Sequence, residues 1–175
     1  LAIAQKLSNS FKDILVIDKE KTFGQHISSR NSEVIHSGVY YPKNSLKSKL
    51  CIKGNKLLYE FMREYDIPFL NCGKLIVASD SEDRKKIDLL FEKSIDENLK
   101  GVRKVGSKEA KDIEPNIKCE SALWVPSSGI MDSHKVMQRL EYNFTASNGI
   151  IAYQTNVKDI DFNDDTYIVG TNTQD

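Results

Sequence analysis

Asp18 stands where a carboxylate could bind a sugar. It directly follows residues 14–17, an unbroken β-favouring apolar run that is typical of a strand buried on both faces. A carboxylate there can accept hydrogen bonds from two ribose hydroxyls. The alternative is a plain end of a buried strand, since many α/β proteins end strands with acids. The residues alone leave both interpretations open.

His36 is the one histidine inside an apolar run, the segment EVIHSGVYYP of residues 33–42. A neutral imidazole that titrates near pH 7 suits a general base. A lone histidine in such a run is, however, more often a core residue than a catalyst. Tyr40 and Tyr41 could offer hydroxyls to a substrate carboxylate or could simply pack. Alternation along an extended chain puts them on opposite faces, so we expect at most one of them to face a site.

Other catalytic and metal-binding patterns are missing from the sequence. There is no G-x-S-x-G motif and no Walker loop, and the histidines and cysteines show no paired ligand spacing, so we expect no metal. An odd number of widely spaced cysteines favours a reducing compartment over a disulfide scaffold. The three are Cys51, Cys72 and Cys119.

Composition indicates an ordinary globular chain. Twenty-five basic and 25 acidic residues give a net charge of zero, which argues against a nucleic-acid partner. No apolar run approaches the roughly 20 residues of a membrane span. Between Pro42 and Leu58 there are five lysines and no acid. A solvated helix face is the default explanation for them, as it is for the acid-rich helix expected from Asp80 to Glu97. A dicarboxylate substrate and an anionic membrane surface are the alternatives.

The expected elements alternate between helices and strands, which indicates an α/β fold. We predict helices over about residues 1–7, 45–65, 81–100 and 133–148, and a helical turn from Ser107. Strands are predicted near residues 14–17, 74–78 and 102–105. A strand, a turn and a return are predicted over 122–132, and two final strands over 150–162 and 165–172. Ser45 should cap the second helix, and Asp80 or Ser81 the third. The apolar face expected for the second helix comprises Leu46, Leu50, Leu57, Leu58, Phe61 and Met62.

In a dinucleotide-binding βαβ unit, a G-x-G-x-x-G turn precedes the ribose-binding acid by about 20 residues. A position about 20 residues before Asp18 would lie just upstream of Leu1. We therefore expect the glycine turn just upstream, in a longer protein, and expect this piece alone to be inactive.

One segment carries a resemblance to a known family. Residues 28–51, SSRNSEVIHSGVYYPKNSLKSKLC, are followed by CGKLIVAS and later by SSGIMDSHKV. This combination resembles the FAD-dependent oxidoreductases of the D-amino acid oxidase-like superfamily, above all the L-2-hydroxyglutarate dehydrogenase/oxidase family. The pattern is N-S-x-V-I-H-x-G-I-Y-Y, with S-L-K-x-x-L-C after it. The resemblance implies a Rossmann-like FAD-binding domain with an inserted α+β substrate domain. We expect the first at residues 1–66 and 132–175, and the second at 67–131.

The resemblance also implies a reaction. L-2-hydroxyglutarate, or a similar 2-hydroxy acid, would pass a hydride to FAD and become a 2-oxo acid, with oxygen or a quinone as the electron acceptor. His36 would be the catalytic base, and Tyr40 and Tyr41 would bind substrate. The FAD-binding residues would be Asp18, Lys19, Ser29, Arg30, Asn31, Ser32 and Val157. A related amine oxidase, a glycerol-3-phosphate dehydrogenase and an inert truncated chain are the alternatives. The expected location is the cytoplasm, with peripheral contact at the inner membrane as an open alternative.

Overall fold

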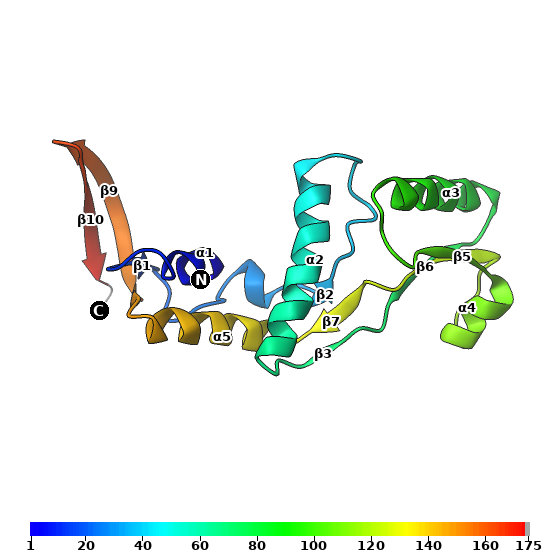
Figure 1. The fold of residues 1–175 in the computed structure, drawn as a ribbon, viewed down its shortest axis with the longest axis horizontal. Coiled ribbons are helices and arrows are strands. Elements are labelled where there is room, and N and C mark those ends of the chain that lie inside the picture. The colour runs from blue at the N-terminus through cyan, green and yellow to red at the C-terminus, as the bar shows by residue number, and fades with distance from the viewer. Residues whose placement is uncertain (174–175) are drawn as a thin grey trace. The chain divides into compact units, whose positions relative to one another are not determined.

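The computed structural model describes residues 1–173, which form two compact units (Figure 1). The first unit joins Leu1–Ser32 to the chain from Ser133 onward, and the second is Glu33–Asp132. The second unit begins well before residue 67, where we expected the inserted section to start. The reason is that β2 (Val34–Ile35) pairs with β7 (Gly129–Met131). Which residues serve FAD and which serve substrate stays a prediction.

The first unit is built around a parallel strand pair. The strand β1 (Leu15–Ile17) pairs in parallel with β8 (Ile150–Ala152). The helices are α1 (Ala2–Leu7), α5 (Ser133–Ala146) and the short 3-10 helix η1 (Ile27–Ser29). A hairpin of β9 (Thr155–Asn163) and β10 (Thr166–Thr173) follows. Residues 150–162, expected as one strand, are therefore two strands, because the chain turns through Gln154 at a positive φ of 53°.

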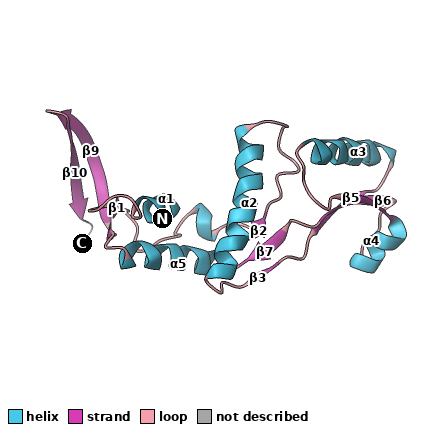
Figure 2. Ribbon diagram, viewed as in Figure 1, coloured by secondary structure: helices cyan, strands magenta, loops and turns pink. Residues whose placement is uncertain are grey.

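The second unit contains two antiparallel sheets (Figure 2). One has the order β2-β7-β3, with β3 at Phe69–Leu70. The other has the order β4-β6-β5, from Lys74–Ala78, Ser121–Val125 and Arg103–Gly106. The prediction of a strand, turn and return over residues 122–132 is wrong if it is taken as a hairpin. Both edges of β6 are already paired, so β7 joins the other sheet. There Gly129 permits close packing, since an added Cβ would lie 2.3 Å from the Tyr59 hydroxyl.

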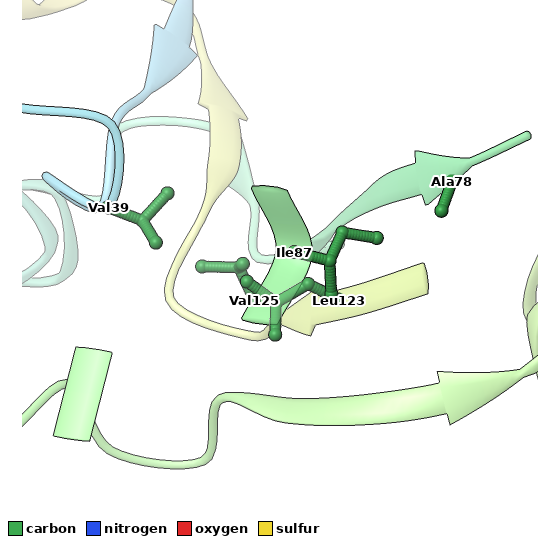
Figure 3. Close-up of a cluster of buried hydrophobic side chains, with 5 residues drawn as sticks. All are labelled: Val39, Ala78, Ile87, Leu123 and Val125. Carbon is green, nitrogen blue, oxygen red and sulfur yellow. The ribbon is translucent and has the colours of Figure 1, made fainter. Parts of the chain in front are cut away.

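Two helices cover opposite faces of the β4-β6-β5 sheet. The helix α3 (Ser81–Asp96) packs Ile87 against Leu123 and Val125. The helix α4 (Ser107–Ile113) packs Ala110 against Val105 and Ala122 on the other face. Figure 3 shows the first cluster, which also includes Val39. Val39 comes from the turn that follows His36, so this core anchors that turn.

Of the apolar face expected for the helix α2 (Leu46–Glu64), Met62 alone is buried. Its other buried residues are Ser48 and Tyr59, whereas Leu46 and Leu50 are 72% and 58% exposed. At 100° per residue the exposed leucines lie opposite the buried face. The helix therefore has two apolar faces, and only the one next to Glu97 and Phe69 is covered within the second unit.

The cap of α3 gives a first prediction. The Asp80 carboxylate accepts hydrogen bonds from the backbone N–H groups of Glu82 and Asp83, both at 2.9 Å. Asp80→Ala should lower the free energy of unfolding by about 0.5–2 kcal/mol, measured by urea denaturation. Asp80→Asn keeps the acceptor and should cost little, and Ser81→Ala is the neighbouring control. Equal stability of the Asp80→Ala variant and wild type would show that the cap contributes nothing.

Candidate functional site

Asp18 lies at the carboxyl end of the parallel pair, as the sequence predicted. Its backbone N–H donates to the Ala152 carbonyl at 3.0 Å, and its own carbonyl accepts from Thr155 N–H at 3.0 Å. The Oδ1 atom accepts the Glu20 N–H at 2.9 Å. Among the described residues, no protein donor binds Oδ2. This half-buried carboxylate can therefore still accept a hydrogen bond from a sugar hydroxyl, and in that respect the site fits a ribose.

The start of β9 lies beside Asp18. Thr155 bonds to Asp18, and the backbone N–H of Gln154 donates to the Glu20 carbonyl at 2.9 Å. Val157 follows two residues later, 39% exposed and opposite Thr171 of β10. The structure thus brings the strand that carries Val157 to the same edge as Asp18 and the exposed Lys19.

The loop of residues 28–32 is exposed along its whole length. The Asn31 Nδ2 atom donates to the carbonyl of Ser28 at 2.6 Å, and the Ser29 hydroxyl donates to the His26 carbonyl at 3.2 Å. These two side chains therefore shape the loop. Arg30 and Ser32 lie on its surface, where an anion could reach them.

His36 lies just after β2, on the surface of the second unit. His36 helps to line a shallow depression. The lining residues are Val34, Ile35, His36, Cys51, Gly54, Asn55 and Leu58. The Asn55 side-chain amide donates to the His36 carbonyl at 3.0 Å. Within residues 1–173 the imidazole itself has no hydrogen-bond partner. The backbone of His36 is therefore held, while its ring is available to a ligand in the depression.

Tyr40 and Tyr41 do not continue a strand, so the expected alternation of their side chains is wrong. The strand β2 ends at Ile35, and Tyr41 N–H donates to the Gly38 carbonyl at 3.1 Å in a turn. Gly38 has a φ of 89°, which favours glycine and ends the extended backbone. We call residues 38–41 the tyrosine turn.

A lysine lies over each ring of the tyrosine turn. The Nζ atom of Lys74 is 4.9 Å from the Tyr40 ring centroid, and that of Lys47 is 4.4 Å from the Tyr41 centroid. Burial raises the pKa of Tyr40, so its hydroxyl stays protonated at neutral pH. Sequence analysis did not single out Lys74, because its place beside Tyr40 depends on the folding of two separate segments. Positive charge beside two phenols suits an anionic ligand.

Residues 1–173 contain neither a membrane-spanning helix nor a cluster of metal ligands. No helix within residues 1–173 is both long and apolar enough to cross a bilayer. No three His, Cys, Asp or Glu side chains in the same residues gather in a way that could hold a metal ion.

The fold, with a parallel pair that ends in an acid and a largely antiparallel second unit, matches that of solved flavoprotein oxidoreductases. The L-alpha-glycerophosphate oxidase of Mycoplasma pneumoniae, solved with FAD bound, has a TM-score of 0.89 and is 26% identical, over 99% of this chain and 47% of its own. The L-proline dehydrogenase of P. horikoshii has a TM-score of 0.85 at 20% identity, over 98% and 46%. This second likeness shows the fold alone.

The family model for FAD dependent oxidoreductases, DAO, matches residues 1–175, and the chain belongs to this family. FAD is therefore its cofactor, as the resemblance implied. Mitochondrial L-2-hydroxyglutarate dehydrogenase of Arabidopsis thaliana is 45% identical over 140 residues, which cover 80% of this chain and 29% of the relative. The human protein of that name is 36% identical over 146 residues, covering 83% and 32%. The chain thus spans about a third of the length of these relatives.

Proposed function

We propose that this chain contributes to an FAD-dependent enzyme that oxidises L-2-hydroxyglutarate, or a close 2-hydroxy acid, to the 2-oxo acid. The observation that carries the proposal is the ring of His36, available beside a depression and followed by the lysine-flanked tyrosine turn. The names of the relatives support the substrate class. FAD, when bound, supplies the acceptor for the hydride that leaves the carbinol carbon.

His36 is the proposed general base. Oxidation of an alcohol removes a hydride from carbon and a proton from the hydroxyl oxygen. A neutral imidazole nitrogen can take that proton. The nitrogen that takes the proton must be free of protein hydrogen bonds, and no described residue hydrogen-bonds the His36 ring.

The tyrosine turn is the proposed site for substrate carboxylates. Tyr40 and Tyr41 can donate phenolic hydrogen bonds to carboxylate oxygens. Lys74 and Lys47, over the two rings, add positive charge. A dicarboxylate gains from both features, which favours a 2-hydroxy acid with a second carboxylate.

The FAD-binding residues proposed from the sequence all belong to the first unit. Asp18 would accept hydrogen bonds from the ribose, and the backbone of Val157 would meet the adenine edge. The exposed loop would contact the pyrophosphate and ribityl groups. The set is Asp18, Lys19, Ser29, Arg30, Asn31, Ser32 and Val157.

Oxidation of glycerol 3-phosphate is the second candidate, favoured by the 26% identity and TM-score of 0.89 to the Mycoplasma oxidase. Anaerobic flavin reduction with L-2-hydroxyglutarate, D-2-hydroxyglutarate, L-lactate and glycerol 3-phosphate separates the two. We expect L-2-hydroxyglutarate to be faster than L-lactate by more than about tenfold, because lactate leaves the site for the second carboxylate unpaired. Faster reduction by glycerol 3-phosphate would replace our proposal with the second candidate.

The electron acceptor is proposed to be oxygen or a quinone-type compound. We propose a cytoplasmic location, with peripheral contact at the inner membrane through the lysines of α2. Comparing oxygen uptake with quinone reduction tests the acceptor. Sedimentation of the holoenzyme with anionic vesicles tests the membrane contact.

A further inference from the structure

A buried ion pair lies near the end of α3, where the sequence suggested only a solvated face. The Nζ atom of Lys93 is 3.1 Å from Oε2 of Glu97, and the two side chains are only 14% and 8% exposed. The neighbouring pair of Lys43 and Asp96 is 50% exposed on each side. Burying two charges is costly, and an apolar pair of similar size is often as stable. The ion pair therefore calls for an explanation other than stability.

The ammonium group of Lys93 binds the backbone just after His36. It donates to the carbonyl of Gly38 at 3.1 Å and to that of Val39 at 2.8 Å. Both carbonyls belong to the tyrosine turn. An apolar side chain at position 93 could not supply these donors.

The carboxylate of Glu97 binds the other end of the same segment. It accepts the fully buried Ser48 hydroxyl at 2.8 and 2.9 Å, and the Asn44 backbone N–H at 3.3 Å. These bonds and the Lys93 ammonium outweigh burial and hold the pKa of Glu97 below its usual value. One ion pair thus fixes the chain between the tyrosine turn and the first turn of α2.

We propose that Lys93 and Glu97 are positioning residues, which hold the tyrosine turn and the adjacent His36 in the geometry that the substrate requires. The inference rests on the proposed function, because it assigns a role to the turn in that reaction. Neither residue needs to touch substrate or FAD. Val39, which belongs to the same buried cluster as Ile87, provides the second anchor of the turn (Figure 3).

The test is the Lys93→Met/Glu97→Gln double variant of the FAD-loaded holoenzyme, which removes both charges together. We expect flavin reduction at saturating L-2-hydroxyglutarate to fall about 10- to 100-fold, because small misplacements of reacting groups are that costly. The apparent dissociation constant for substrate should rise, while FAD content stays unchanged. The single variant Lys93→Arg retains the positive charge and the hydrogen-bond donors, so it should keep most of the wild-type reduction rate. The control is Lys104→Met/Asp88→Asn, which removes an ion pair that joins α3 to β5.

Hydrogen exchange of the backbone amides of residues 39–44 provides a readout that needs no substrate. We expect faster exchange in the double variant and none of this change in the control. If the double variant folds poorly, Ser48→Ala removes one bond to Glu97 and should show the same effects more weakly.

The outcomes separate this inference from the proposed function. A lower melting temperature with a normal reduction rate would overturn the inference and make the pair purely structural. Unchanged exchange at residues 39–44 would overturn it as well. If wild type is not reduced by any 2-hydroxy acid, the proposed function fails. Faster exchange in the double variant would then still support the positioning of the turn.

Discussion

His36→Ala should slow flavin reduction by about 10²- to 10⁴-fold while flavin content stays nearly normal. Without the imidazole, no side chain in the depression of the second unit can readily take the hydroxyl proton at neutral pH. The other described side chains that line it are apolar, an amide and the Cys51 thiol, whose pKa is raised chiefly by burial. Stopped-flow bleaching of the flavin under anaerobic conditions measures the effect.

Two further variants make this result specific. His36→Gln retains hydrogen-bonding capacity but loses the base, so it should stay slow. His134→Ala removes an exposed histidine from the first unit and should leave the rate unchanged. A near-normal bleaching rate in His36→Ala, together with a lower melting temperature, would make His36 a packing residue.

Asp18→Ala should weaken FAD binding by about 1.5–3 kcal/mol, or roughly 10- to 150-fold in the dissociation constant. The reason is the loss of the carboxylate that is proposed to accept the ribose hydroxyls. Fluorescence titration of the apoprotein with FAD measures this constant. Asp18→Glu should weaken FAD binding less than Asp18→Ala does, because glutamate keeps the negative charge.

The controls for Asp18 separate binding from folding. Its Oδ1 atom also accepts the Glu20 N–H, so Ala removes a turn contact as well. Asp18→Asn can keep that acceptor, and it should leave the melting temperature near wild type while weakening FAD binding. Asp161→Ala removes an exposed acid from β9, and it should change neither the melting temperature nor the dissociation constant for FAD. An unchanged FAD constant in Asp18→Ala would reduce Asp18 to the end of a strand.

Local signals in the sequence determined where several elements begin. Ser45 caps α2 by accepting the Ser48 N–H at 3.1 Å, and Asp80 caps α3, both as predicted. The run before Asp18 is indeed a strand, and it pairs in parallel. Caps and apolar runs act within a few residues, so they can be read from one segment. The family motif around His36 likewise lies within one continuous segment of the sequence.

Contacts between distant segments decided the rest. Ser48 lies on the inner face of α2, where its hydroxyl bonds to Glu97 from another helix end, whereas the more apolar Leu46 and Leu50 stay exposed. The turn at Gly38 takes Tyr40 and Tyr41 off the expected strand, and it places Tyr40 beside Lys74 of β4, a distant segment. Lys93 and Glu97 look like the charged residues of any solvated helix. Their burial follows from the segment packed over them, because burial depends on what covers a residue and not on its own type.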